Sequence, residues 1–322
     1  MTLAVALTCG DPSGIGPELA LAARQALGDA VPLFWIGDPR HLGSDAFAVI
    51  DDPTEADQVP AHLLPVLPHR FASPALPGQP APENAAGVIE VIERAVALVQ
   101  SGQASAICTA PIHKKALKDG AGFAFPGHTE FLAHLVGVDR VVMMLASPLL
   151  RVVPVTIHIA VADVPQALTA ELLEATIRIT DAGLRRDFGL AQPRLAVAGL
   201  NPHAGEGGAM GSEEISLITP VLERLRAQGF DLRGPASADT MFHARAREGY
   251  DAAICMYHDQ ALIPIKTLDF DGGVNVTLGL PFVRTSPDHG TAYDIAGKGL
   301  ARPDSLIAAL KMAHEMAAAR LG

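Results

Sequence analysis

Three histidines, His158, His203 and His258, stand at or just after apolar runs that are typical of buried β-strands. In open parallel α/β sheets, ligands bind beyond the carboxyl ends of the strands. Neighbouring strands could therefore bring three imidazoles together. Neutral imidazoles suit a divalent ion such as Zn²⁺, Co²⁺ or Ni²⁺, with positions left open for a substrate. A single such histidine is more often an ordinary hydrogen-bonded strand end, but three in matching positions favour a metal site.

The surroundings of His203 support this interpretation. The segment NPHAGEGG, residues 201–208, follows a predicted strand and precedes a predicted helix. Glycine-rich turns let backbone approach a ligand closely. The alternative is an ordinary connection, but the mixture of His, Glu and three glycines favours a binding loop.

Polar residues set in apolar sequence indicate a second kind of site. Lys266, Asn275 and Arg284 lie in such surroundings, where an unpartnered buried cation is costly. We expect them to face a cavity or an anion, and arginine can bind a phosphate or carboxylate bidentately. Each alone could form a surface ion pair. Together with GHTE, residues 127–130, they make an anion-binding group.

The N-terminal loop GDPSGIGPE, residues 10–18, lies between a predicted strand and a predicted helix. Free amides at a helix start attract anions, so the loop is either a phosphate cradle or a tight turn without a ligand. It has neither GK[ST] nor GxGxxG, and no Rossmann fingerprint occurs elsewhere in the chain.

Strand-like and helix-like runs alternate along the chain and predict an α/β fold with a largely parallel sheet and helices on both faces. A Pro-rich stretch, residues 60–82, is the one linker-like segment, and no repeat is visible. Strands are predicted over residues 3–8, 31–36, 104–109, 141–145, 152–159, 194–200 and 252–257, and helices over residues 17–27, 83–101, 128–135, 172–188, 212–228 and 305–321.

Length and composition narrow the class of protein. A chain of 322 residues fits two lobes or one large α/β unit. The net charge of −11 disfavours nucleic-acid binding. No apolar run suits a membrane span, and the first residues do not read as a signal peptide. The three scattered cysteines indicate buried thiols in a reducing compartment, so we expect the protein in the cytoplasm.

Long motifs in this chain resemble the 4-hydroxythreonine-4-phosphate dehydrogenase (PdxA) family. They include TCGDPSGIGPE, TAPIHKKAL, FPGHTEFLA, NPHAGEGG, MYHDQALIPIK and NVTLGLPFVRTSPDHGT, and they run in order from the first predicted strand to the last helix. The resemblance implies NAD-dependent oxidation of 4-phosphohydroxy-L-threonine in pyridoxal 5′-phosphate (vitamin B6) biosynthesis. The oxidised acid then loses CO₂ and gives 3-amino-2-oxopropyl phosphate.

The resemblance also implies a fold similar to the isocitrate and isopropylmalate dehydrogenases, which bind NAD without a Rossmann fingerprint. Residues 1–322 would form one catalytic unit of two lobes with the active site in the cleft between them. The lobe boundaries and the NAD-contacting residues stay open. A homodimer with residues of both subunits at each active site is implied. Carried over by motif, the metal ligands are His158, His203 and His258, and the substrate-binding residues are His128, Thr129, Lys266, Asn275 and Arg284.

We expect one divalent ion per site, with zinc, magnesium and cobalt as candidates, and either NAD or NADP as the hydride acceptor. A bound ion lowers the pKa of a hydroxyl group. Lys266, Asp239 and Asp259 are the candidates for the group that takes the hydroxyl proton.

Three rival functions remain at this point. A dehydrogenase of a sugar-acid phosphate, such as D-threonate or D-erythronate 4-phosphate, would share the same motifs. A phosphate acyltransferase of similar fold would need no metal, and the three histidines argue against it. A non-catalytic metal- or phosphate-binding protein would need neither the full polar group nor a nicotinamide site.

Overall fold

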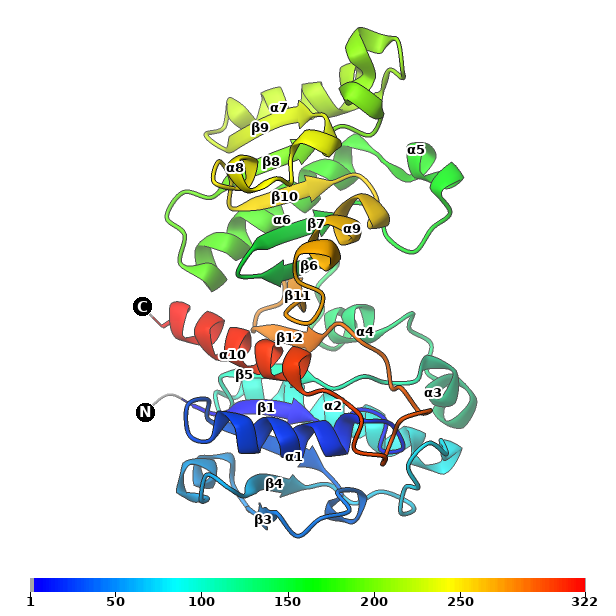
Figure 1. Ribbon diagram of the computed structural model, residues 1–322, viewed down its shortest axis with the longest axis vertical. Coiled ribbons are helices and arrows are strands. Elements are labelled where there is room, and N and C mark those ends of the chain that lie inside the picture. The colour runs from blue at the N-terminus through cyan, green and yellow to red at the C-terminus, as the bar shows by residue number, and fades with distance from the viewer. Residues whose placement is uncertain (1–2, 322) are drawn as a thin grey trace. The chain divides into compact units, whose positions relative to one another are not determined.

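The computed structural model describes residues 3–321, and the chain divides into two compact α/β units (Figure 1). The first unit comprises residues up to Asp139 and from Leu280 onward, and the second comprises Arg140–Gly279. In the described part of the chain, no helix is both long and apolar enough to cross a membrane.

The first unit is built on parallel strands that are buried along most of their length. Helices α1 (Gly16–Leu27) and α10 (Asp304–Ala319) pack side by side on one face of these strands, and α2 (Ala85–Gln100) covers the other (Figure 1). Helices α3 (Lys114–Ala121) and α4 (His128–Leu135) follow the strand β5. The strand order is β3 (Phe47–Val49), β4 (Leu64–Pro68), β2 (Leu33–Gly37), β1 (Val5–Thr8), β5 (Ala106–Thr109) and β12 (Arg284–Pro287).

The second unit has a mixed sheet. Its strand order is β11 (Val274–Leu278), β6 (Val142–Ser147), β7 (Leu150–Pro154), β10 (Ala252–Cys255), β8 (Arg194–Ala198) and β9 (Asp231–Ala236). The four strands from β7 to β9 are parallel, whereas β6 runs antiparallel to both of its neighbours. The helices are α5 (Val164–Ala167), α6 (Ala170–Phe188), α7 (Thr219–Arg226), α8 (Ala244–Arg247) and α9 (His258–Leu268).

Helix α9 is fixed on the sheet of the second unit by its apolar side. Ala261, Leu262 and Ile265 are buried in a core cluster with residues of β7, β8 and β10. Burial of apolar surface of this kind is the main favourable term in folding. The packing holds the first turn of α9, and with it His258, at one edge of the sheet.

The predicted fold class, α/β with a largely parallel sheet and flanking helices, is confirmed. The strand predicted over residues 152–159 is too long, because β7 ends at Pro154. His158 adopts φ 53°, a left-handed conformation that cannot continue an extended strand. The helix predicted over residues 212–228 begins instead as a π-helical turn, Glu214–Ile218, before α7. Several elements were not predicted, namely α3, α5, α8, α9, β3, β4, β9, β11 and β12.

The Pro-rich stretch that looked like a linker contains β4 and is tied to α1 by a buried arginine. The guanidinium of Arg24, 2% exposed, donates to the carbonyl oxygens of Leu63 at 3.0 Å, Gly28 at 2.6 Å and Val59 at 3.1 Å. Its acidic partner Asp29 is largely exposed and lies 3.3 Å away. Arg24 therefore contributes mainly by satisfying buried carbonyl groups.

We expect Arg24→Met to lower the free energy of unfolding by about 3 kcal/mol, because it leaves several buried carbonyl groups without donors. Urea unfolding followed by circular dichroism would measure the loss. Asp29→Asn is the control, with an expected change below about 0.5 kcal/mol, since exposed ion pairs contribute little. Equal losses in the two variants would contradict this account.

Candidate active site

Three parallel strands end at the same edge of the second unit's sheet. Strand β10 lies between β7 and β8, with Ala253 paired to Val152 on one side and to Ala196 on the other. The chain reaches His158, His203 and His258 within a few residues of the ends of these strands. The topology therefore places all three histidine-bearing segments at one edge.

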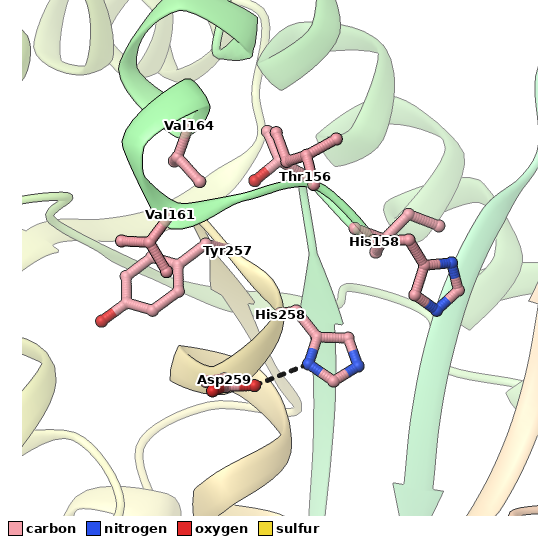
Figure 2. Close-up of a pocket in the computed structure, with 9 residues that line it drawn as sticks. Thr156, His158, Val161, Val164, Tyr257, His258 and Asp259 are labelled. Atoms are coloured by element: carbon pink, nitrogen blue, oxygen red, sulfur yellow. Dashed lines mark hydrogen bonds and ion pairs between the residues drawn. The ribbon is translucent and has the colours of Figure 1, made fainter.

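Hydrogen bonds beyond the strand ends bring two of these segments together. The Thr156 hydroxyl and the Thr156 amide both donate to the carbonyl oxygen of Met256, at 2.7 and 3.2 Å. His158 and His258 each stand two residues beyond this pair. Their ring centroids lie 5.7 Å apart (Figure 2).

The two histidines line a cavity of about 250 Å³. Most of the other side chains that line this cavity are apolar. Figure 2 shows Val161, Val164 and Tyr257 on its other side. An apolar wall lowers the local dielectric constant and strengthens electrostatic interactions inside the cavity. The cavity is therefore suited to chemistry that involves charge at the imidazoles.

Asp259 fixes the orientation of one imidazole. Its Oδ1 lies 2.7 Å from Nδ1 of His258 (Figure 2). A carboxylate at Nδ1 holds the proton there and leaves Nε2 as the nitrogen with a free lone pair. This is the arrangement in which a histidine binds a metal ion through Nε2.

The loop that carries His203 has an unusual backbone. Residues 203–207 all have positive φ, and three of them, His203, Ala204 and Glu206, are not glycine. Together with His158, two of the predicted ligands thus adopt left-handed conformations. Such outliers cost about 1–3 kcal/mol each and cluster at functional sites.

A buried carboxylate holds this loop in place. Glu214, 3% exposed, accepts hydrogen bonds from the Asn201 amide at 2.8 Å and from Asn201 Nδ2 at 3.0 Å. Gly205 has φ 77°, and a Cβ there would lie 2.6 Å from Glu214 Oε2. Gln260 Nε2, in the first turn of α9, donates to the carbonyl oxygen of Gly199 at 2.8 Å, which links the base of the loop to the segment of His258.

The donor set fits a divalent ion in part. Bonds of about 2 Å to one tetrahedral ion would place two imidazole centroids about 5 Å apart, close to the 5.7 Å observed for His158 and His258. His203 is not brought into the same group. Within residues 3–321, no three His, Cys, Asp or Glu side chains lie close enough together to hold a metal ion. The three-histidine ligand set therefore stays a prediction.

His128, Thr129 and Arg284, predicted to bind the substrate, belong to the first unit. His128 begins α4, and its Nε2 is buried without a hydrogen-bond partner among the described residues. Desolvation of the ring, and then the positive charges of Arg284 and Lys114, lower the pKa of His128 well below its usual value. The ring is therefore neutral near pH 7.

Arg284 is 3% exposed at the start of β12. Its Nη2 donates to the Thr109 hydroxyl at 2.6 Å. Burial lowers the pKa of Arg284 to about 10, so the guanidinium stays charged at neutral pH. A buried permanent cation next to a neutral imidazole is an arrangement that can bind an anion.

Lys266 and Asn275, also predicted to bind the substrate, belong to the second unit. Lys266 lies near the end of α9, with Nζ 5.7 Å from the centroid of the Phe270 ring. Asn275 on β11 pairs with Leu145 of β6, and its Oδ1 is buried without a hydrogen-bond partner in the described part of the chain. A buried acceptor of this kind is costly unless a ligand donates to it.

Asp239, predicted as an acceptor of the hydroxyl proton, is hydrogen-bonded within its own turn. Asp239 lies in a short 3₁₀ turn, where its Oδ1 accepts a hydrogen bond from the Ser237 hydroxyl at 2.6 Å.

In the N-terminal loop, the Ser13 amide donates to Asp11 Oδ1 and the Ile15 amide donates to the Thr291 carbonyl. Because these amides are already bonded, the structure favours a tight turn over a phosphate cradle.

Three residues that the sequence did not single out contribute to these sites. Asn201 and Glu214 fix the His203 loop, and Lys114 lies beside His128. Lys114 could have been noticed in the sequence, because two lysines in the first turn of a helix interact unfavourably with the helix dipole. Glu214 could not, since only the folded loop shows that its carboxylate is buried.

Comparison with known proteins identifies the family of this chain. The family model described as pyridoxal phosphate biosynthetic protein PdxA matches residues 26–313. A 4-hydroxythreonine-4-phosphate dehydrogenase of Roseobacter denitrificans is 65% identical over 98% of both chains, and one of Paracoccus denitrificans is also 65% identical over 98% of both.

Solved structures of the same family have the same fold. The crystal structure of a 4-hydroxythreonine-4-phosphate dehydrogenase from Klebsiella pneumoniae has a TM-score of 0.90 at 39% identity and covers 98% of this chain and all of its own. A β-decarboxylating dehydrogenase from Thermococcus kodakarensis, with a TM-score of 0.51 and 16% identity, shares the fold alone. The chain therefore belongs to the PdxA family of pyridoxal phosphate biosynthetic proteins.

Proposed function

We propose that this chain oxidises 4-phosphohydroxy-L-threonine with NAD and releases CO₂ to give 3-amino-2-oxopropyl phosphate. Relatives that are 65% identical over nearly the whole chain carry the name of this activity. The observation that carries the proposal is the pair His158 and His258, whose rings lie 5.7 Å apart beyond the ends of adjacent parallel strands.

The proposed metal ligands are His158, His203 and His258, with Asp259 orienting the ring of His258. When bound, a divalent ion supplies the charge that lowers the pKa of a hydroxyl group and stabilises an enolate, and NAD supplies the hydride acceptor. Zinc, magnesium and cobalt are the candidate ions, and NADP is the alternative acceptor.

The remaining polar residues would bind and orient the substrate. His128, Thr129 and Arg284 can hold an anionic group, since Arg284 keeps its charge while buried. The unpartnered Oδ1 of Asn275 can accept a hydrogen bond from a hydroxyl or ammonium group. We propose that the two units form one active site in the cleft between them, where these groups meet the same substrate.

Lys266, Asp239 and Asp259 are the proposed acceptors of the hydroxyl proton. The contact of Asp259 with His258 suits it to orient a ligand, and the contact of Asp239 with Ser237 suits it to a local turn. Lys266 is the only one of the three that the resemblance also places among the substrate-binding residues, so we favour it for proton transfer.

We further propose a homodimer in which residues of both subunits complete each active site. The three imidazoles of one site can then come from two subunits. The cytoplasm is the proposed location, because the three cysteines are unpaired buried thiols, which a reducing compartment preserves.

The function is tested by following NADH formation at 340 nm with metal-loaded protein. We expect a strong preference for 4-phosphohydroxy-L-threonine over D-threonate and D-erythronate 4-phosphates, and loss of activity with a chelator. A preference for a sugar-acid phosphate would overturn the substrate assignment. No NADH with any of the three would overturn the dehydrogenase assignment itself.

We expect Lys266→Ala to lower turnover about 10²- to 10⁴-fold, the usual contribution of a positioned acid or base. The content of bound metal should not change, because lysine is not a proposed ligand. Elemental analysis beside steady-state kinetics would measure both. His258→Ala is the matched variant, in which metal content and turnover should fall together; a loss of metal in Lys266→Ala would rule out its role in proton transfer.

We expect Asp259→Asn to weaken metal binding about 10- to 100-fold, because a ligand histidine loses the carboxylate that orients it. Titration against a chromophoric chelator gives the affinity without any need for turnover. Asp239→Asn is the control and should bind metal as tightly as the unmodified protein. Unchanged affinity in Asp259→Asn would show that the contact with His258 does not serve a metal ligand.

A further inference from the structure

The start of α3 places two lysines where the helix dipole disfavours them. Lys114 and Lys115 occupy the first turn, and no acidic residue accompanies them there. Positive charges at a helix N-terminus are destabilising by a few tenths of a kcal/mol or more. Lys115 has a compensating partner in Asp119, one turn along the same helix. Within residues 3–321, Lys114 forms no ion pair that would compensate in the same way.

The Lys114 side chain extends to the start of α4. A Cβ placed on Gly127 would lie 3.5 Å from Lys114 Cε, 3.6 Å from Lys114 Nζ and 3.4 Å from Glu130 Oε2. The lysine and the glutamate thus approach the same point, yet they form no salt bridge in the described part of the chain. Gly127 has φ −176° and ψ −170°, an extended conformation open to any residue. The absence of a side chain at Gly127 leaves the Lys114 ammonium group close to the backbone at the start of α4.

The first amides of α4 are available as donors. Gly127 caps the helix without a side-chain hydrogen bond, and the first intrahelical bond is that of the Phe131 amide to the Gly127 carbonyl. The amides of His128, Thr129 and Glu130 donate to no acceptor among residues 3–321. Free amides at a helix start, aided by the helix dipole, bind phosphate groups.

Two permanent cations act on this helix start. Desolvation, and then the charges of Arg284 and Lys114, lower the pKa of His128, so both cations act on the first residue of α4. Arg284 is buried and fixed by Thr109, whereas Lys114 is exposed and approaches from the side of Gly127. A phosphate dianion needs two cations for charge balance, whereas one arginine suffices for a carboxylate.

We propose that Lys114 is a further substrate-binding residue, whose ammonium group contacts the phosphate of the substrate beside Arg284 at the start of α4. The inference rests on the proposed function for its substrate, and it adds a residue to that site. The Lys114 ammonium group is a compact charge at the end of a flexible side chain, as in lysines at other phosphate sites. The guanidinium of Arg284 is planar and can bind two phosphate oxygens at once.

Kinetics of Lys114→Met, with Lys115→Met as the matched control, test the inference. Loss of one charge-assisted hydrogen bond should raise KM for 4-phosphohydroxy-L-threonine about 10- to 100-fold, with kcat within about threefold of the unmodified enzyme. Lys115→Met should leave both constants unchanged, and Lys114→Arg should restore most of the affinity. An unchanged KM in Lys114→Met, or an equal rise in Lys115→Met, would overturn the inference.

A binding measurement separates this inference from the proposed function. Calorimetric titration of the full chain, without metal or NAD, would use inorganic phosphate as the probe. Phosphate should bind the unmodified protein and bind Lys114→Met at least about tenfold more weakly. If the enzyme were inactive on the substrate but showed this difference, the proposed function would fail and Lys114 would still stand as an anion-binding residue. No phosphate binding, or equal binding by the two proteins, would overturn the role of Lys114.

Gly127→Ala offers a second, independent variant. Its added methyl group would meet Lys114 and Glu130 at ordinary contact distances, so the melting temperature should stay unchanged. The methyl group would crowd the Lys114 ammonium group and hinder its contact with a phosphate at the start of α4, so KM should rise about tenfold or more. Unchanged kinetics in this folded variant would contradict the location of the phosphate.

Discussion

The parallel pairing of β10 with β7 and β8 is the constraint on which the candidate metal site depends. Parallel strands of one sheet end at a common edge, so a residue a few positions past each strand arrives in the same region. The bonds from Thr156 to Met256 extend this alignment beyond the strands and place His158 and His258 opposite each other. A shift of the register between β7 and β10 would move the segments of His158 and His258 out of alignment.

Two of the histidine-bearing segments have strained backbone conformations, and neighbouring groups stabilise the one that carries His203. His158 and His203 both have φ near 50°, where an L side chain is strained. Around His203, the buried carboxylate of Glu214 satisfies Asn201, and Gly205 lets the loop pass against that carboxylate. The strain thus lies in loops that carry proposed ligands, while the strands below them are regular and buried.

The first unit carries the candidate anion site of a protein that is negatively charged overall. The chain has a net charge of −11, so the protein as a whole does not attract an anionic substrate. Arg284 remains charged in a buried position, and Lys114 reaches the same helix start from the surface. The proposed anion site therefore depends on local cations and on free helix amides, not on the net charge of the protein. The neutral state of His128 keeps its ring available as a hydrogen-bond donor or acceptor rather than a third charge.

The sequence by itself determined the α/β class, most of the buried strands and the identity of the polar residues at their ends. Apolar runs that end in His158, His203 and His258 follow from chain-local patterns of hydrophobicity, which need no knowledge of the fold. Long motifs such as NPHAGEGG were sufficient to indicate the family. Helix α9 was missed because only Met256 and Tyr257 separate it from β10, and neither is a glycine or proline that would mark a turn in the sequence.

Only the tertiary structure decided which of these residues lie together. Strand order is set by contacts between segments about 100 residues apart, such as Val152 with Ala253, and local sequence carries no record of them. The same holds for Glu214, whose carboxylate gains its role only when the His203 loop folds over it. Lys114 likewise acquires a candidate ligand only because α4 begins beside it. Residue types set the chemistry that is available, and long-range packing sets which groups can share a substrate.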